Sequence, residues 1–165
     1  MNISYKIPQS ILAVIYTKEL DVLLIERADR QGFWQSVTGS RNSLSENLEQ
    51  TAIREIFEET GIIVVDTVTD PDPARRQVAK RYLTDWKIEH DFEIFSVWRH
   101  RFAPGVTTNT EHVFGLQVPT RFDVVLEPKE HLNAIWLPWK EAAAKCFSWT
   151  NKEAIDLLPE HIIEN

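Results

Sequence analysis

The chain of 165 residues contains a single cysteine, Cys146, so it forms no internal disulfide. A lone cysteine is typical of proteins that fold in a reducing compartment. No apolar run approaches the ~20 residues that a transmembrane helix requires. Residues 1–17 also lack the basic stretch, apolar run and small-residue cleavage site of a signal peptide. These absences predict a soluble protein of the cytoplasm that does not associate with membranes.

An excess of positive charge is missing as well. The chain has 18 Lys and Arg against 25 Asp and Glu, for a formal net charge of −7. Proteins that grip a nucleic-acid backbone usually present a basic face, so no nucleic-acid partner is expected. An acidic protein can still bind a polyanion when metal ions lie between the two negative groups. The composition leaves the oligomeric state open, and a monomer is plausible.

Length and hydrophobicity predict one compact domain over residues 1–165, since 43% of the residues are hydrophobic. Strands are expected at 10–16, 20–25, 33–37, 62–68, 92–102, 110–118 and 134–137. Helices are expected at 46–60, 138–146 and 150–158, with N-caps at Ser45 and Thr150 and a C-cap at Gly61. The segment 70–91 is expected to be an excursion with a short helix. Mixed strands and helices predict an α/β fold in which helices cover both faces of a sheet.

Three carboxylates share one face of the predicted helix 46–60. Glu55, Glu58 and Glu59 stand at i, i+3 and i+4, which places them on the same side at about 100° per residue. Their mutual repulsion is relieved by hard divalent cations, which prefer several carboxylate oxygens. Such cations neutralise the charge that develops when a phosphoanhydride bond is hydrolysed. Taken alone, the pattern equally describes an ordinary solvated acidic face.

The residues around this helix resemble the Nudix box. The matching positions are Gly39, Glu46, Arg54, Glu55, Ile56, Glu58, Glu59, Gly61 and Ile62. The resemblance implies an α/β/α sandwich with a mixed sheet and a Mg²⁺-dependent pyrophosphohydrolase, with Mn²⁺ as a possible substitute. It also implies that Glu46 and Arg54 pair to anchor the loop to the helix. One departure is the spacing between Gly39 and Glu46, which holds six residues where the box has five.

Other runs resemble the dihydroneopterin triphosphate pyrophosphatase branch of the Nudix family. They are YKIPQS (5–10), FWQSVTGS (33–40), FEIF (92–95), RHRFAPGVTTNTE (99–111), EHL (130–132) and SWTN (148–151). This resemblance covers most of the chain. It implies that a small-molecule triphosphate, dihydroneopterin triphosphate, loses pyrophosphate and leaves the monophosphate, a step of folate biosynthesis.

The resemblance to this branch also assigns roles to individual residues. The implied metal-binding acids are Glu55, Glu59 and Glu130, with Glu58 as a further candidate. The catalytic role falls on Glu55, Glu58 and Glu59. The implied substrate-binding positions are Lys6, Arg27, Thr38, Phe92, Glu93, Ile94, Phe95 and Ser148.

Physical chemistry supports some of these roles and leaves alternatives for each. Lys6 and Arg27 are suitable partners for phosphate, although a solvated terminal lysine and a surface charge at a strand end are the ordinary alternatives. Phe92 and Phe95 offer a flat apolar surface for a pterin or a base, and they equally suit core packing. Glu130 could also belong to a solvated loop.

Three histidines and one serine invite other chemistry. The spacing of His100, His112 and His131 matches no zinc signature, so satisfied structural histidines are expected. Ser148 has no base close to it in sequence, which argues against a serine nucleophile.

The segment 70–91 is longer than the branch pattern and carries a basic cluster. Its members are Arg75, Arg76, Lys80 and Arg81. They would either add phosphate contacts above a pocket or form a surface excursion, and the excursion is the default expectation.

Two rival functions remain open at this point. A general nucleoside triphosphate pyrophosphohydrolase, acting for example on dATP, would use the same metal site because a pocket that stacks a pterin can stack a purine. A non-catalytic Nudix sensor would bind a nucleotide-like ligand. Such domains commonly have broken boxes, whereas this chain keeps all three box carboxylates.

Overall fold

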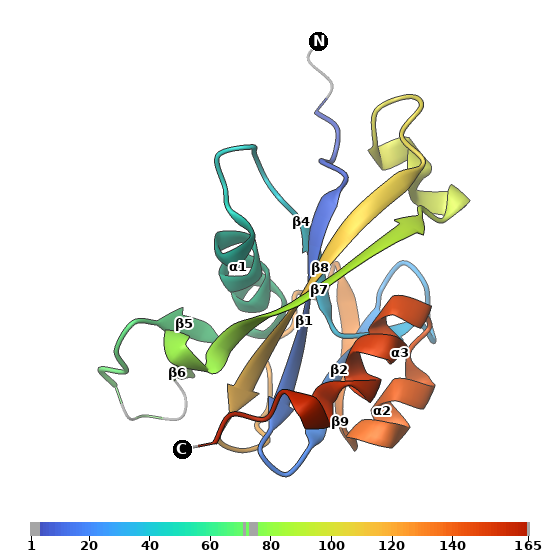
Figure 1. Cartoon of the computed structure of the whole chain (residues 1–165). Coiled ribbons are helices and arrows are strands. Elements are labelled where there is room, and N and C mark those ends of the chain that lie inside the picture. The colour runs from blue at the N-terminus through green and yellow to red at the C-terminus, as the bar shows by residue number, and fades with distance from the viewer. Residues whose placement is uncertain (1–3, 71, 73–75, 165) are drawn as a thin grey trace.

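A seven-stranded mixed sheet forms the centre of the computed structural model, which describes residues 4–70, 72 and 76–164 (Figure 1). Its strands are β1 (Gln9–Thr17), β2 (Asp21–Arg27), β3 (Trp34–Gln35), β4 (Val37–Ser40), β7 (Leu83–Glu93), β8 (Thr108–Val118) and β9 (His131–Pro138). A separate pair of parallel strands is formed by β5 (Ile63–Val65) and β6 (Gln77–Ala79).

Strand β1 organises the sheet. It runs parallel to β8 along its whole length, from Gln9 opposite Thr110 to Thr17 opposite Val118. On its other side it pairs antiparallel with β4 and then with β2. Strands β7 and β9 add antiparallel partners to β8 and β2. The sheet therefore joins segments about a hundred residues apart, and the predicted hairpin of the first two strands is confirmed.

Helices cover both faces of this sheet (Figure 1). The helices are α1 (Leu48–Thr60), α2 (Trp139–Lys145) and α3 (Trp149–Asp156), with 3₁₀ turns η2 (Lys80–Tyr82), η3 (Ser96–Arg101) and η4 (Leu158–Glu160). Successive β1 side chains point to opposite faces. Ile11, Ala13 and Ile15 belong to the core under α1, whereas Leu12, Val14 and Tyr16 belong to the core under α2 and α3. The predicted α/β/α sandwich is confirmed.

The N-cap of α1 differs from the prediction. Asn47, not Ser45, caps the helix, and the helix begins at Leu48. The Asn47 side chain accepts from the Gln50 backbone N–H at 2.8 Å, and the Gln50 side chain accepts from the Asn47 N–H at 2.8 Å. This reciprocal pair satisfies two N–H groups of the first turn. The predicted C-cap, Gly61, is confirmed and has a left-handed φ of 80°.

The segment predicted as an excursion contains part of the main sheet. Residues 77–93 form β6, η2 and all of β7, and residues 96–101 form a 3₁₀ turn where a strand was predicted over 92–102. Strand β7 was missed because one of its faces is solvated. Its buried residues alternate with charged ones and are interrupted by a bulge between Asp85 and Glu89. Pro71, Pro73 and Arg75 lie outside the described residues.

The remaining differences are at element ends. The strand predicted at 33–37 is split into β3 and β4, β5 is shorter than 62–68, and β9 begins three residues before 134. Ser148, not Thr150, is the N-cap of α3, because its hydroxyl accepts from the Asn151 N–H at 3.4 Å. Across the described part of the chain, no helix is both long enough and apolar enough to cross a membrane.

Candidate active site

Two adjoining cavities form one cleft at an end of the central sheet. The aromatic cavity, of about 600 Å³, has walls that include Phe92, Phe95, Trp98, Phe102, Phe147 and Trp149. The acidic cavity, of about 460 Å³, is lined by residues that include Glu55, Glu59, Glu130 and His131. Both cavities share Lys6, Arg27, Thr38, Gly39, Ser40 and Arg101. A ligand with a flat ring and a charged tail can therefore occupy both halves at once.

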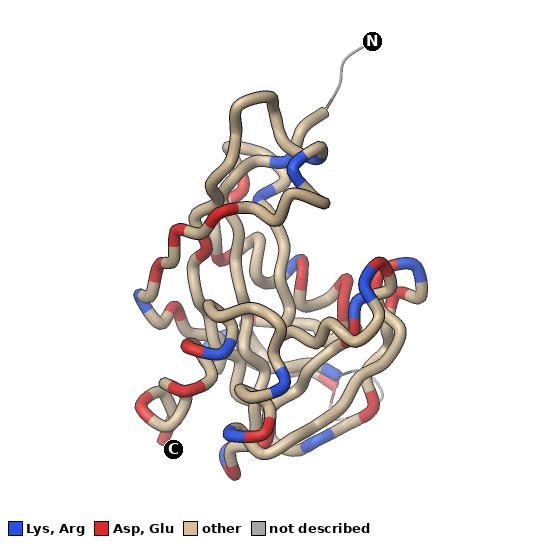
Figure 2. Tube along the Cα trace, turned by 90° about the vertical axis from the view of Figure 1, so that its right-hand side faces the viewer, with Lys and Arg blue, Asp and Glu red and all other residues tan. Residues whose placement is uncertain are grey.

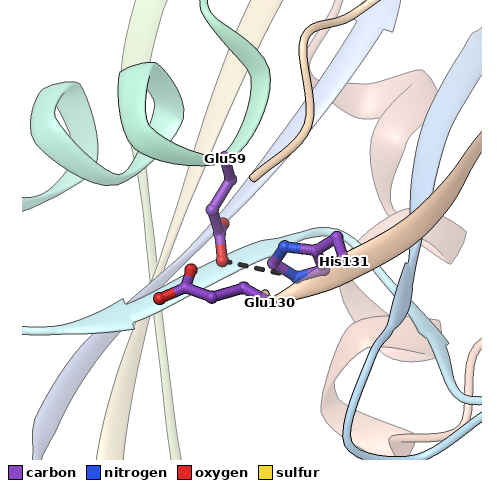
Figure 3. Close-up of side chains that lie close together, drawn as sticks. All are labelled: Glu59, Glu130 and His131. Carbon is purple, nitrogen blue, oxygen red and sulfur yellow. Dashed lines mark ion pairs between the residues drawn. The ribbon is translucent and has the colours of Figure 1, made fainter. Parts of the chain in front are cut away.

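Helix α1 and the start of β9 build the acidic cavity. Glu59 descends from α1 with only 3% of its surface exposed, and its carboxylate accepts a hydrogen bond from the Thr38 N–H at 3.2 Å. Glu130 and His131 approach it from the opposite side (Figure 3). One ligand atom from each of these three residues lies within 4.8 Å of the others, and His131 Nε2 is 3.6 Å from Glu59 Oε1.

The electrostatics of this cluster favour a cation. Burial raises the pKa of Glu55 to about 7, and burial with the nearby charges of Glu55 and Glu130 raises the pKa of Glu59 well above its usual value. Burial and Arg27 lower the pKa of His131 to about 4, so its imidazole is neutral at pH 7. Ionising these buried acids is costly without a nearby positive charge. A hard divalent ion supplies that charge and prefers carboxylate oxygens as ligands.

Gly39 is required where β4 passes α1. A Cβ atom at this position would lie 2.0 Å from Cδ of Glu55, closer than any real contact. The missing side chain lets the Glu55 carboxyl lie against the strand. The glycine of the box is therefore explained by packing and not by a left-handed backbone.

An ion pair holds the loop before α1 in place, as the box resemblance implies. Arg54 Nε donates to Glu46 Oε2 at 2.8 Å, and the same guanidinium donates to the Ser40 carbonyl at 2.9 Å and to Glu55 Oε1 at 2.7 Å. Arg41 Nε donates to the Glu46 carbonyl at 2.8 Å within the lengthened loop. The predicted structural pairing of Glu46 and Arg54 is confirmed, and the extra residue leaves it intact.

Glu58 occupies a different position from the other acids of the box. Its side chain is 49% exposed, pairs with Arg54 at 3.2 Å, and lies outside the lining of both cavities. The structure therefore brings Glu55, Glu59 and Glu130 together and leaves Glu58 at the margin. Its metal-binding and catalytic role stays a prediction.

Basic side chains lie between the two cavities. Lys6, Arg27 and Arg101 line both of them, and several basic positions gather near the N-terminal end of the described trace in Figure 2. Arg27 forms a two-point ion pair with Asp29 at 2.7 and 2.8 Å, and its guanidinium stacks on Trp98 at 4.4 Å. Burial, followed by the charge of Arg101, lowers the pKa of Lys6.

The predicted substrate-binding residues line the aromatic cavity. Phe92, Glu93, Ile94, Phe95 and Ser148 all line it, and Thr38 lines both cavities. The side chain of Phe95 is 47% exposed, and neither Phe92 nor Phe95 belongs to a core cluster. The alternative of ordinary core packing is therefore wrong for both rings.

The sequence did not indicate several residues of the cleft. His131 was expected to be a satisfied structural histidine, yet its buried Nδ1 has no hydrogen-bond partner among the residues described, and the ring faces Glu59. Its position directly after Glu130 was the available signal. Arg101 and Trp98 were hidden because 92–102 was predicted as a strand. His112, by contrast, pairs with Glu89 at 3.2 Å.

The basic cluster of the segment 70–91 lies away from the cleft where it is described. Arg76, Lys80 and Arg81 line neither cavity. Lys80 pairs with Glu49 at 2.8 Å, and Arg76 lies over the ring of Phe122. The three described members of the cluster therefore lie outside the cleft, and Arg75 lies outside the described residues.

A comparison with protein families decides the affiliation of the chain. The model of the family described as "NUDIX domain" matches residues 6–158. The chain belongs to the Nudix family. Helix α1 and the loop that Arg54 anchors are thus the Nudix box of this member.

Individual Nudix relatives are similar over nearly the whole chain. The dihydroneopterin triphosphate diphosphatase of Escherichia coli K12 is 42% identical over 153 residues, 92% of each chain. The enzyme of that name from Haemophilus influenzae is 38% identical over 156 residues, covering 94% of this chain and 89% of the relative. The solved structure of the E. coli dihydroneopterin triphosphate pyrophosphohydrolase superposes with a TM-score of 0.75, covering 92% of this chain and 94% of that one.

Proposed function

We propose that this Nudix enzyme hydrolyses dihydroneopterin triphosphate to dihydroneopterin monophosphate and pyrophosphate, in folate biosynthesis. The observation that carries the proposal is the cleft, in which an aromatic cavity adjoins an acidic one across shared basic residues. The pteridine ring of this substrate fits the aromatic cavity, and its triphosphate chain fits the basic residues and the acidic cavity. The names of relatives at 38% and 42% identity support the same substrate.

In this proposal the basic residues between the cavities hold the phosphates. Lys6, Arg27 and Arg101 place positive charge at the junction, where the chain of phosphates would cross. Arginine offers a planar fork of donors that matches phosphate oxygens. The Thr38 N–H is already committed to Glu59, and its hydroxyl oxygen accepts from Gln35 Nε2 at 3.3 Å, which leaves the hydroxyl proton to be donated to a phosphate oxygen.

Glu55, Glu59 and Glu130 are the proposed ligands of the divalent cation, with Glu58 as a further candidate. The donor set fits Mg²⁺ or Mn²⁺ because the carboxyls line one cavity and are partly desolvated, and hard divalent ions prefer oxygen ligands. When bound, the cation supplies positive charge that offsets the charge developing on phosphate oxygens. Without the cation, burial raises the pKa of Glu55 to about 7, and a bound cation would favour its ionised form, which can accept a proton from water near neutral pH.

A panel of triphosphates tests the proposal. Pyrophosphate release is measured from dihydroneopterin triphosphate and from dATP, each with Mg²⁺, with Mn²⁺ and with a chelator. We expect Mg²⁺-dependent release with a higher kcat/KM for dihydroneopterin triphosphate. Equal or better turnover of dATP would favour the general nucleoside triphosphate pyrophosphohydrolase. No metal-dependent release from any triphosphate would favour the non-catalytic sensor.

We propose further that residues 1–165 act as one domain, as a monomer of the cytoplasm without a nucleic-acid partner. A single cysteine and a net charge of −7 support this setting. Light scattering after size-exclusion chromatography tests the monomer. Cell fractionation tests the location.

A further inference from the structure

The floor of the aromatic cavity carries polar groups that the proposed mechanism does not use. Asn109 and Glu111 stand two residues apart on β8, so their side chains lie on the same face of the sheet, and both line the cavity. Asn109 is 4% exposed and Glu111 is 5% exposed. A carboxyl and an amide are thus buried beneath aromatic walls.

Each of these buried groups has an acceptor without a hydrogen-bond partner. Within the part of the chain that the structure describes, Glu111 Oε1 and Asn109 Oδ1 make no hydrogen bond. The amide nitrogen of Asn109 is already held by Ser10 Oγ at 2.7 Å, which fixes its oxygen as the free acceptor. Buried acceptors left unpaired are costly and rare in folded proteins.

Neighbouring side chains do not remove this deficit. His90 Nδ1 lies 3.9 Å from Glu111 Oε1, which is longer than a hydrogen bond, and His90 is outside the cavity lining. The Thr150 hydroxyl hydrogen-bonds to Glu111, but burial dominates and raises the pKa of this carboxyl to about 7. A ligand with N–H donors in this part of the cavity would hydrogen-bond to the two acceptors that the protein leaves unpaired.

We infer that Glu111, assisted by Asn109, recognises the donor edge of a 2-amino-4-oxopyrimidine ring inside the aromatic cavity. Such a ring presents a ring N–H beside an exocyclic NH₂, and a carboxylate accepts from both at once. Adenine presents an NH₂ beside a ring nitrogen that is itself an acceptor, so one carboxylate oxygen would meet a lone pair. The inference rests on the proposed function, which supplies a pteridine ring with this edge, and it names the residue that selects the ring.

The first test uses the wild-type protein and rings without phosphates. Calorimetry measures the Kd of 2-amino-4-oxopteridine and of its 2,4-dioxo counterpart, which has an oxygen in place of the amino group. We expect the dioxo ring to bind at least about 10-fold more weakly, because a site built to pair an N–H rejects an analogue without it. Equal affinities, or no binding of either ring, would overturn the inference.

The second test separates ring selection from a general defect. Glu111→Gln is compared with Glu89→Gln, a control on the neighbouring strand whose carboxylate pairs with His112 outside the cleft. In Glu111→Gln we expect kcat/KM to fall about 10- to 100-fold for dihydroneopterin triphosphate. The value for dATP should not fall, because the Gln amide donates to the adenine ring nitrogen that a carboxylate oxygen would meet with a lone pair.

The possible outcomes distinguish a failure of the ring assignment from a failure of the proposed function. An unchanged ratio of the two kcat/KM values in a folded Glu111→Gln would overturn the ring assignment alone. If that variant does not fold, the comparison of rings on the wild type decides. Absence of hydrolysis by the wild type, with the ring preference intact, would overturn the proposed function and leave the ring site standing.

Discussion

Glu59 is the acid of the cleft with the least access to water, and it has the greatest need of a positive partner. We predict that Glu59→Gln lowers the rate of pyrophosphate release at least about 100-fold, because losing even an indirect support of a metal ligand costs 10- to 100-fold. The metal-free variant should be at least as stable as the wild type, since Gln is neutral without binding a proton and still offers an acceptor for the Thr38 N–H. Steady-state kinetics and thermal melts measure both effects.

Glu49→Gln is the matched control for this variant. Glu49 lies on the same helix, is 45% exposed and pairs with Lys80 away from both cavities. Its activity should equal that of the wild type. If Glu59→Gln is nearly as active as this control, Glu59 has no role in catalysis.

How far single residues could be predicted depends on how local their contacts are. Glu46 and Arg54 pair across eight positions of one box, and the sequence indicated them correctly. The environment of His131 depends on Glu59, which lies 72 positions earlier in the chain. Residue spacing in the sequence does not predict a contact over that separation. The buried state of Glu111 likewise follows from the pairing of β8 with both β1 and β7.

At the level of elements, the approach of β4 to α1 depends on the absence of a side chain. Gly39→Ala should lower the free energy of unfolding by about 1–3 kcal/mol, because its Cβ would overlap the Glu55 carboxyl. It should also reduce activity at least about 10-fold, because relief of the clash moves Glu55. Denaturant melts and kinetics measure the two losses.

Gly32→Ala provides the comparison for this change. Gly32 has a φ of +86° and open space around the added carbon, so alanine there costs about 1 kcal/mol of backbone strain without a clash. We expect a small loss of stability and no loss of activity. Equal effects on activity in the two variants would contradict the packing argument.

A buried side chain of helix α3 hydrogen-bonds to the residue between β3 and β4, in addition to the apolar packing of the helix on the sheet. Asn151 Oδ1 accepts from the Ser36 N–H at 2.7 Å, and its amide donates to the Ser36 hydroxyl at 2.9 Å. Asn151→Ala should destabilise the fold by about 1–3 kcal/mol, since it leaves a buried N–H unpaired. Lys152→Ala, which removes an exposed pair with Asp156, should change stability by less than about 0.5 kcal/mol. Similar melting temperatures for the two variants would contradict this role.

Elements were predictable where apolar periodicity was strong. Strands β1, β2 and β8 have both faces covered and contain long apolar runs. Strand β7 was not predicted because its exposed face carries charged residues. The 3₁₀ turn η3 was predicted as a strand because its bulky residues are typical of strands. The caps Asn47 and Ser148 were missed by two positions each, since several polar residues precede each helix.

For the molecule as a whole, the raised pKa values make metal-free stability depend on pH. Glu55 and Glu111 both have a folded pKa of about 7 against about 4.5 when unfolded. These acids and Glu59, whose pKa is also raised, hold extra protons in the folded state and outnumber His131, whose lowered pKa of about 4 acts in the opposite direction, so stability falls as pH rises through this window. We predict a lower melting temperature at about pH 8 than at about pH 5 in the presence of a chelator.

Saturating Mg²⁺ should narrow this difference by raising the melting temperature mainly at about pH 8, where the acids of the acidic cavity are ionised and able to bind the cation. Differential scanning fluorimetry over a pH series, with MgCl₂ and with a chelator, measures the effect. A metal-induced shift of the same size at both pH values would contradict the proposed site.

The two halves of the cleft belong to different layers of the sandwich. Glu55 and Glu59 of the acidic cavity lie on α1, whereas Leu12 of the aromatic cavity belongs to the core under α2 and α3, and Phe147 and Trp149 lie at the junction of these two helices. Substitutions in one hydrophobic layer need not disturb the other. Evolution can therefore change the ring that the aromatic cavity binds while the acidic cavity stays the same. An engineer who seeks a new substrate should randomise only residues of the aromatic cavity on the side of α2 and α3.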